Sequence, residues 1–83
     1  MGRTPKEFTD EQISFAVNEI KVQRPDIWEK WVSFEKNNGG YKSILTELYS
    51  VVIPLGLNKN VSELNDLMFE LRKRARVEAG MPL

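Results

Sequence analysis

Apolar side chains recur at spacings of three and four residues along most of this chain, which is the period of one face of an α-helix. The first such face is made by Ile13, Ala16, Val17 and Ile20. Just before it, Thr9 and Gln12 have the spacing of a capping box, in which each side chain accepts a hydrogen bond from the other residue's backbone N–H. Because the dipeptide Arg24–Pro25 interrupts the face, we expect a helix from about Asp10 to Gln23.

A second helix is predicted to follow, and it contains the bulkiest apolar residues of the chain. These are Ile27, Trp28, Trp31 and Phe34. Asp26 and Glu29 repeat the capping-box spacing at its start, and the run Asn37–Gly40 marks its end, because Asn and Gly tolerate the backbone conformation that ends helices. We expect both tryptophans to be buried, since so small a domain needs its aromatic side chains inside. The alternative is that one or both form an exposed anchor for a protein partner.

The rest of the chain predicts two more helices. The apolar positions of the third are Tyr41, Ile44, Leu45, Leu48, Tyr49 and Val52. Pro54 and Gly56 end it, and the fourth helix runs from about Val61 to Ala79, after a third capping box formed by Asn60 and Glu63. No segment alternates with the period of a β-strand. We therefore expect an all-α fold, a compact four-helix domain over residues 8–83 with residues 1–7 as a flexible N-terminal arm.

The composition argues against several classes of function. The 83 residues include no cysteine and no histidine, which removes thiolate chemistry, the commonest general base and the commonest metal ligand. We therefore expect no enzymatic activity, no metal and no cofactor. No apolar run is long enough to span a membrane and no secretory signal follows Met1, so we expect a cytoplasmic protein. Twelve basic residues balance twelve acidic ones, so any contact with nucleic acid needs a local patch of charge.

The fourth helix has the most suggestive surface. Its apolar stripe is Val61, Leu64, Leu67, Met68, Leu71 and Ala75. The stripe is either a core face or, because five of its positions alternate by three and four, the seam of a homodimer. On a helical wheel Phe69 lies outside the stripe beside Arg72, Lys73 and Arg76, and an aromatic ring among cations is typical of surfaces that bind nucleic acid or acidic proteins. The alternative is that acidic residues early in the helix and basic ones late in it, with Glu70 and Arg74 as a pair, only complement the helix dipole.

The junction of the second and third helices has the outline of a helix-turn-helix unit. The residues offered to the major groove of DNA would be Tyr41, Lys42, Ser43 and Thr46. Residues 8–13, 25–27 and 39–44 resemble in part the first three helices of plasmid and phage helix-turn-helix repressors, and the arm from Met1 to Lys6 resembles basic arms that reach a minor groove. The alternative is an ordinary αα-hairpin around a glycine turn.

The sequence therefore supports two hypotheses of function. In the first, this is a small regulatory protein that binds DNA through the helix-turn-helix-like unit, as in transcription regulation, with phosphate contacts from Arg72, Lys73, Arg76 and the N-terminal arm. In the second, it is an adaptor or inhibitor of the phage or plasmid type, which binds a host or partner protein through Phe69 and its cations or through the apolar stripe. Zero net charge favours the second, because dedicated DNA-binding domains are usually basic.

Overall fold

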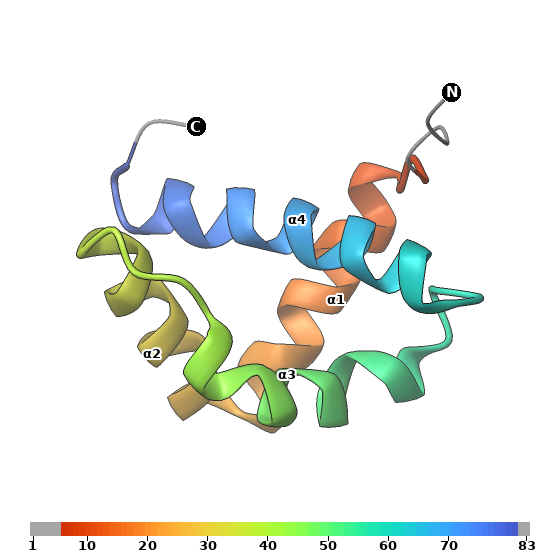
Figure 1. The fold of residues 1–83 in the computed structure, drawn as a ribbon, viewed down its shortest axis with the longest axis horizontal. Coiled ribbons are helices and arrows are strands. Elements are labelled where there is room, and N and C mark those ends of the chain that lie inside the picture. Colours follow the sequence, from red (N-terminus) through yellow and green to blue (C-terminus); the bar gives the residue numbers. More distant parts are fainter. Residues whose placement is uncertain (1–5, 82–83) are drawn as a thin grey trace.

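The computed structural model describes residues 6–81, and in this part of the chain every regular element is helical. The elements, in order, are α1 (Asp10–Gln23), α2 (Pro25–Lys36), the 3-10 turn η1 (Lys42–Ile44), α3 (Leu45–Val52), the 3-10 turn η2 (Ile53–Leu55) and α4 (Val61–Glu78). α1 packs against each of the other three α-helices, and α4 lies across one side of the bundle, over α1 and α2 (Figure 1). The predicted all-α, four-helix domain is confirmed.

Two helix starts follow the expected chemistry. At α1, the backbone N–H of Gln12 donates to Thr9 Oγ1 over 3.1 Å and that of Thr9 donates to Gln12 Oε1 over 3.0 Å, so the capping box is complete. At α4, Asn60 Oδ1 accepts from the N–H of Glu63 over 2.9 Å. The return bond differs from the prediction, because Glu63 Oε1 accepts from the N–H of Lys59 instead of Asn60.

The predicted cap of the second helix is wrong. α2 begins at Pro25, and its N-cap residue is Arg24, whose side chain makes no capping bond. Proline suits the first position of a helix, because its φ is already helical and the N–H that it lacks would have no partner there. Asp26 therefore lies inside the first turn, where its two carboxylate oxygens accept hydrogen bonds from the Arg24 guanidinium over 3.2 and 3.1 Å. These bonds lower the pKa of Asp26.

The predicted third helix is divided into three pieces. It opens as η1, continues as α3 and closes as η2, so Pro54 lies within a helical turn instead of beyond the end. The tighter turn tolerates Pro54 in its first positions, for the same reason that an α-helix tolerates proline there. The chain then leaves the turn at Gly56, whose φ of 73° is in the left-handed region that glycine adopts at no steric cost.

The core contains the side chains that the helical spacing selects. Trp28 and Trp31 are 4% and 0% exposed, as expected, and their rings meet edge to face with centroids 5.6 Å apart. The α4 stripe from Leu64 to Ala75 is buried within this chain, so a homodimer through α4 would need another face. Val61 was assigned to the stripe wrongly. It is 72% exposed, because it opens the helix at the edge of the core, one turn before the first buried position.

Within residues 6–81, no helix is both long enough and apolar enough to cross a membrane.

Candidate functional site

A buried ion cluster joins α2 to α4. Glu35 has no exposed surface, and its carboxylate accepts a hydrogen bond from Trp31 Nε1 over 3.1 Å. It also accepts from Arg72 Nε, 3.1 Å from both of its oxygens, and from Arg76 Nη1 at 3.2 Å. Glu35 was not among the predicted site residues, although it stands seven residues after Trp28 and four after Trp31, on the buried face of α2.

The ion cluster changes the role of two predicted phosphate contacts. Arg76 is only 20% exposed at its side chain, and it pairs with the buried carboxylate of Glu35. Arg72 is held through Nε alone and remains 41% exposed. No further hydrogen bond holds Arg72 among residues 6–81. Arg72 is the more exposed of the two arginines that hold Glu35, so it is the member of the cluster that presents positive charge at the surface.

Arg72 lines a groove between α3 and α4, which we call the α3–α4 groove. Its cavity volume is about 340 Å³, and its lining residues are Gly40, Tyr41, Lys42, Leu45, Tyr49, Asn65 and Arg72. The groove thus brings together three predicted site residues, Tyr41, Lys42 and Arg72. They come from two predicted sites that are distant in the sequence.

The chemistry of the α3–α4 groove is cationic and aromatic. Tyr41 is half-buried, with its ring 5.1 Å from that of Trp31. Burial, and secondly the neighbouring Tyr49, raise the pKa of the Tyr41 phenol above its ordinary value of 10.0. Lys42 is exposed and forms no ion pair within residues 6–81. No carboxylate is among the described lining residues. The groove therefore offers positive charge, hydrogen-bond donors and apolar ring faces.

The helix-turn-helix outline is only partly present. Ser43 and Thr46 are exposed beside Lys42, as a DNA-reading surface needs. However, residues 37–44 separate α2 from α3, whereas the turn of such a unit has about three to four residues. In addition, α3 packs chiefly on α1. The part of the predicted arm up to residue 5 lies outside the described residues.

Phe69 lies in a different environment from the one that the helical wheel indicates. Its ring is 56% exposed, as expected, and Lys73 Nζ lies 4.8 Å from the ring centroid. Arg72 and Arg76 instead reach Glu35. The Phe69 ring belongs to a hollow of about 500 Å³ lined by Lys6, Glu7, Phe8, Asp10, Ile13, Asp66, Phe69 and Glu70. Four of these residues are acidic, so the described surroundings of Phe69 are not a basic patch.

The predicted pair of Glu70 and Arg74 is also not formed. Glu70 pairs with Lys73 at 3.2 Å, and Arg74 reaches towards α1.

Comparison of this chain with family models, curated proteins and solved structures found no match. In the described part of the chain, no three acidic side chains gather so that they could hold a metal ion.

Proposed function

We propose that this protein is a non-enzymatic adaptor, and that its α3–α4 groove binds an acidic segment of a partner protein. The segment would place a carboxylate at Arg72 and Lys42 and an apolar side chain against Tyr41, Leu45 and Tyr49. The proposal is supported by a groove that these two cations line together with two phenol rings, and in which no described lining residue is acidic. An arginine guanidinium suits a carboxylate in particular, since it can donate two parallel hydrogen bonds.

The observation that carries this proposal is the attachment of Arg72 to Glu35. Its Nε donates to both carboxylate oxygens over 3.1 Å, so the planar guanidinium has a fixed orientation before any ligand arrives. Ordering a flexible side chain on binding costs about 0.5–1.5 kcal/mol. Because Arg72 Nε is already bound to Glu35, the free protein has already met part of this cost. Such preorganisation favours recognition of a defined partner.

A protein ligand fits the charge distribution better than duplex DNA does. DNA binding needs several cations that can reach successive phosphates. At the basic end of α4, however, Lys73 pairs with Glu70 and Arg76 pairs with Glu35, and Arg74 reaches towards α1 and does not line the α3–α4 groove. The DNA hypothesis keeps one favourable observation, which is the exposure of Lys42, Ser43 and Thr46 together around the start of α3.

The proposal is tested by titrating the isotope-labelled protein with two peptides and a duplex while recording amide NMR spectra. One peptide alternates Glu and Asp with Leu and Phe, and the matched peptide has Gln and Asn in place of the acids. We expect the acidic peptide to shift the amides of Tyr41, Lys42 and Tyr49, and the neutral peptide to bind at least about tenfold more weakly.

Two variants locate the site. Lys42→Gln removes an exposed cation of the groove and should weaken the acidic peptide several-fold without unfolding the protein. Lys59→Gln removes an exposed lysine from the turn before α4 and should change nothing. The adaptor proposal fails if the two variants bind the peptide equally, or if a random duplex binds more tightly than the peptide and shifts Lys42, Ser43 and Thr46.

A further inference from the structure

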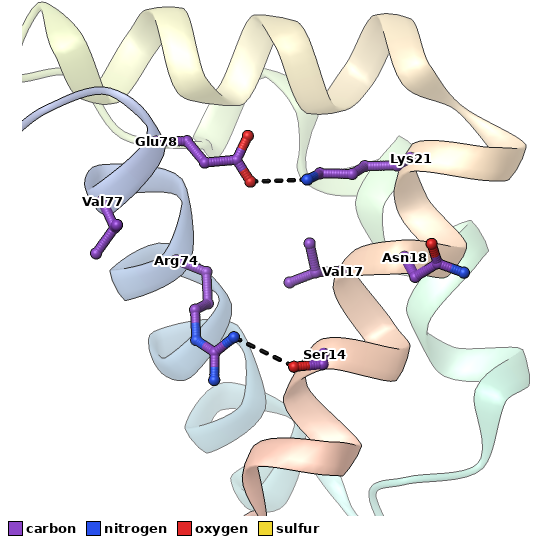
Figure 2. A pocket seen from close by; sticks show the side chains of 7 residues that line it. All are labelled: Ser14, Val17, Asn18, Lys21, Arg74, Val77 and Glu78. Carbon is purple, nitrogen blue, oxygen red and sulfur yellow. Dashed lines mark hydrogen bonds and ion pairs between the residues drawn. The ribbon is translucent and has the colours of Figure 1, made fainter.

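A second hollow lies on another side of the molecule, between α1 and α4, and we call it the α1–α4 pocket. Its volume is about 400 Å³. α1 contributes Ser14, Val17, Asn18 and Lys21, and α4 contributes Arg74, Val77 and Glu78 (Figure 2). It shares no lining residue with the α3–α4 groove. The volume is within the range of about 300–1,000 Å³ that is usual for small-ligand sites.

At one end of the α1–α4 pocket the charged side chains are paired with each other. Glu78 Oε2 lies 2.9 Å from Lys21 Nζ, and Glu78 Oε1 accepts a hydrogen bond from Trp28 Nε1 over 3.1 Å. Burial by itself would raise the pKa of Glu78, but these two hydrogen bonds lower it below its ordinary value. The Lys21 ammonium also lies 5.6 Å from the centroid of the Trp28 ring. Lys21 and Glu78 therefore hold each other, and this end offers a ligand little net charge.

The other end has a cation with weak partners. Arg74 Nη1 donates to the neutral hydroxyl of Ser14 over 3.3 Å, as Figure 2 shows. Arg74 Nη2 lies 3.5 Å from a carboxylate oxygen of Asp10, whose side chain is 96% exposed. Both distances are long for hydrogen bonds that involve a charged group. Because so exposed an ion pair is screened by water, the charge of Arg74 is only weakly neutralised.

The middle of the α1–α4 pocket is apolar. Val17 is buried, and Figure 2 shows it between the two polar contacts, whereas Val77 is exposed and lies at the outer edge, on the side of α4 away from α1. A ligand that follows this arrangement has an anionic group for Arg74 and a short apolar body for the valines. A planar carboxylate matches the guanidinium, since two parallel N–H bonds can form. A cationic group would meet the positive charge of Arg74.

We infer that the α1–α4 pocket binds a carboxylate on a short aliphatic stem, with the carboxylate on Arg74 and Ser14 and the stem against Val17 and Val77. Two sources have this chemistry, namely a free aliphatic acid and a glutamate side chain of a partner segment. Exposed apolar side chains on α1 lie beside the pocket, since Phe15 is three residues before Asn18 and Val22 is four residues after it. Only a partner segment would cover these two side chains.

Titration with pentanoate, followed by amide NMR, tests the inference, and pentanamide is the neutral control of the same length. Saturable shifts of Ser14, Asn18 and Val77 are expected with pentanoate and not with pentanamide. Arg74→Gln should weaken pentanoate about tenfold, because a hydrogen bond to a charged group is lost. Ser14→Ala, at an exposed position that leaves the fold intact, should weaken it by a smaller factor.

The matched control is Arg24→Gln, which removes an arginine that pairs locally with Asp26 and should leave pentanoate binding unchanged. The inference is overturned if pentanamide gives the same shifts, if the shifts lie elsewhere, or if folded Arg74→Gln and Ser14→Ala both bind like the wild type. None of these results depends on the α3–α4 groove.

The source of the carboxylate is decided with the peptide acetyl-Leu-Glu-Leu-amide. Tighter binding than pentanoate, with added shifts at Phe15 and Val22, assigns the carboxylate to a partner segment. Binding no tighter than that of pentanoate, with shifts confined to the pocket, assigns it to a free acid. Failure of both probes to reach the pocket removes the inference altogether.

Discussion

Replacing Glu35 by alanine tests whether the buried ion cluster fastens α2 to α4. The change removes the acceptor for Trp31 Nε1, Arg72 Nε and Arg76 Nη1 at once. Removing one partner of a fully buried ion pair costs about 3–5 kcal/mol, chiefly because the other charge stays buried without compensation. Here the side chains of Arg72 and Arg76 are 41% and 20% exposed, so water can reach both. We therefore expect a loss near the lower limit, about 3 kcal/mol.

This loss is large for a chain of 83 residues. At about 0.05–0.15 kcal/mol per residue, the whole free energy of unfolding is roughly 4–12 kcal/mol. A loss of about 3 kcal/mol lowers the Tm by roughly 12–24 °C, since each kcal/mol shifts it by about 4–8 °C in domains of this size. Urea unfolding, followed by the fluorescence of the two tryptophans, measures the change in free energy.

Two further variants separate the ion cluster from a general effect of losing a glutamate. Glu29→Ala removes an exposed carboxylate from the same helix and should change the free energy of unfolding by less than about 0.5 kcal/mol. Glu35→Gln keeps an acceptor oxygen but loses the charge, so its stability should lie between those of the wild type and Glu35→Ala. A loss below about 1 kcal/mol for Glu35→Ala would refute the reasoning, because the cluster would then contribute no more than one ordinary hydrogen bond.

Three smaller predictions concern a cap, a turn and a titrating carboxylate. Thr9→Ala removes the acceptor for the N–H of Gln12 and should cost about 1 kcal/mol in urea unfolding, whereas an unchanged midpoint would contradict the capping role. Gly56→Ala should cost roughly 1–2 kcal/mol, although a Cβ there meets no atom within 4 Å, because the φ of 73° is unfavourable for alanine. Glu78 has a pKa in the folded state below its ordinary value of 4.5, so its contribution to stability is full above that pH and is lost as the pH falls through the lowered pKa. The Tm difference between wild type and Glu78→Gln, measured from pH 7 to pH 3, should therefore shrink below about pH 4.5, and a constant difference would contradict this.

The helices could be predicted from the sequence because their signals are local. The spacing of Ile13, Val17 and Ile20, with Thr9 as the cap, fixes α1 without reference to the rest of the chain. The prediction failed where two local signals compete. Both Pro25 and Asp26 are typical of helix starts, and the fixed φ of proline took the first helical position. At the third helix, apolar spacing alone does not distinguish α-helical from 3-10 turns, which share contacts three residues apart.

The candidate site was less predictable, because its geometry depends on contacts between helices. A helical wheel places Phe69 and Arg72 near one another on α4, but it contains no information on the carboxylate that α2 brings to Arg72. The burial of Glu35 could have been suspected from its place on the face that also carries Trp28 and Trp31. A charged residue on such a face needs partners with opposite charge, and α4 is the helix with the most cations.

The basic end of α4 shows why a count of cations does not measure the charge that a protein offers to a partner. Its basic residues meet carboxylates from three helices: Glu35 of α2, Glu70 of α4 itself and Asp10 of α1. A segment that is strongly basic in sequence is therefore partly neutralised in the fold. Positive charge remains available at this end of α4 where an arginine stays accessible beside its partner. One such arginine is Arg72, which is bound to Glu35 through Nε alone and is 41% exposed, and another is Arg74, whose two partners lie 3.3 and 3.5 Å away. Each lines a hollow that also contains apolar side chains, so both sites proposed for this protein are built around an accessible arginine of α4.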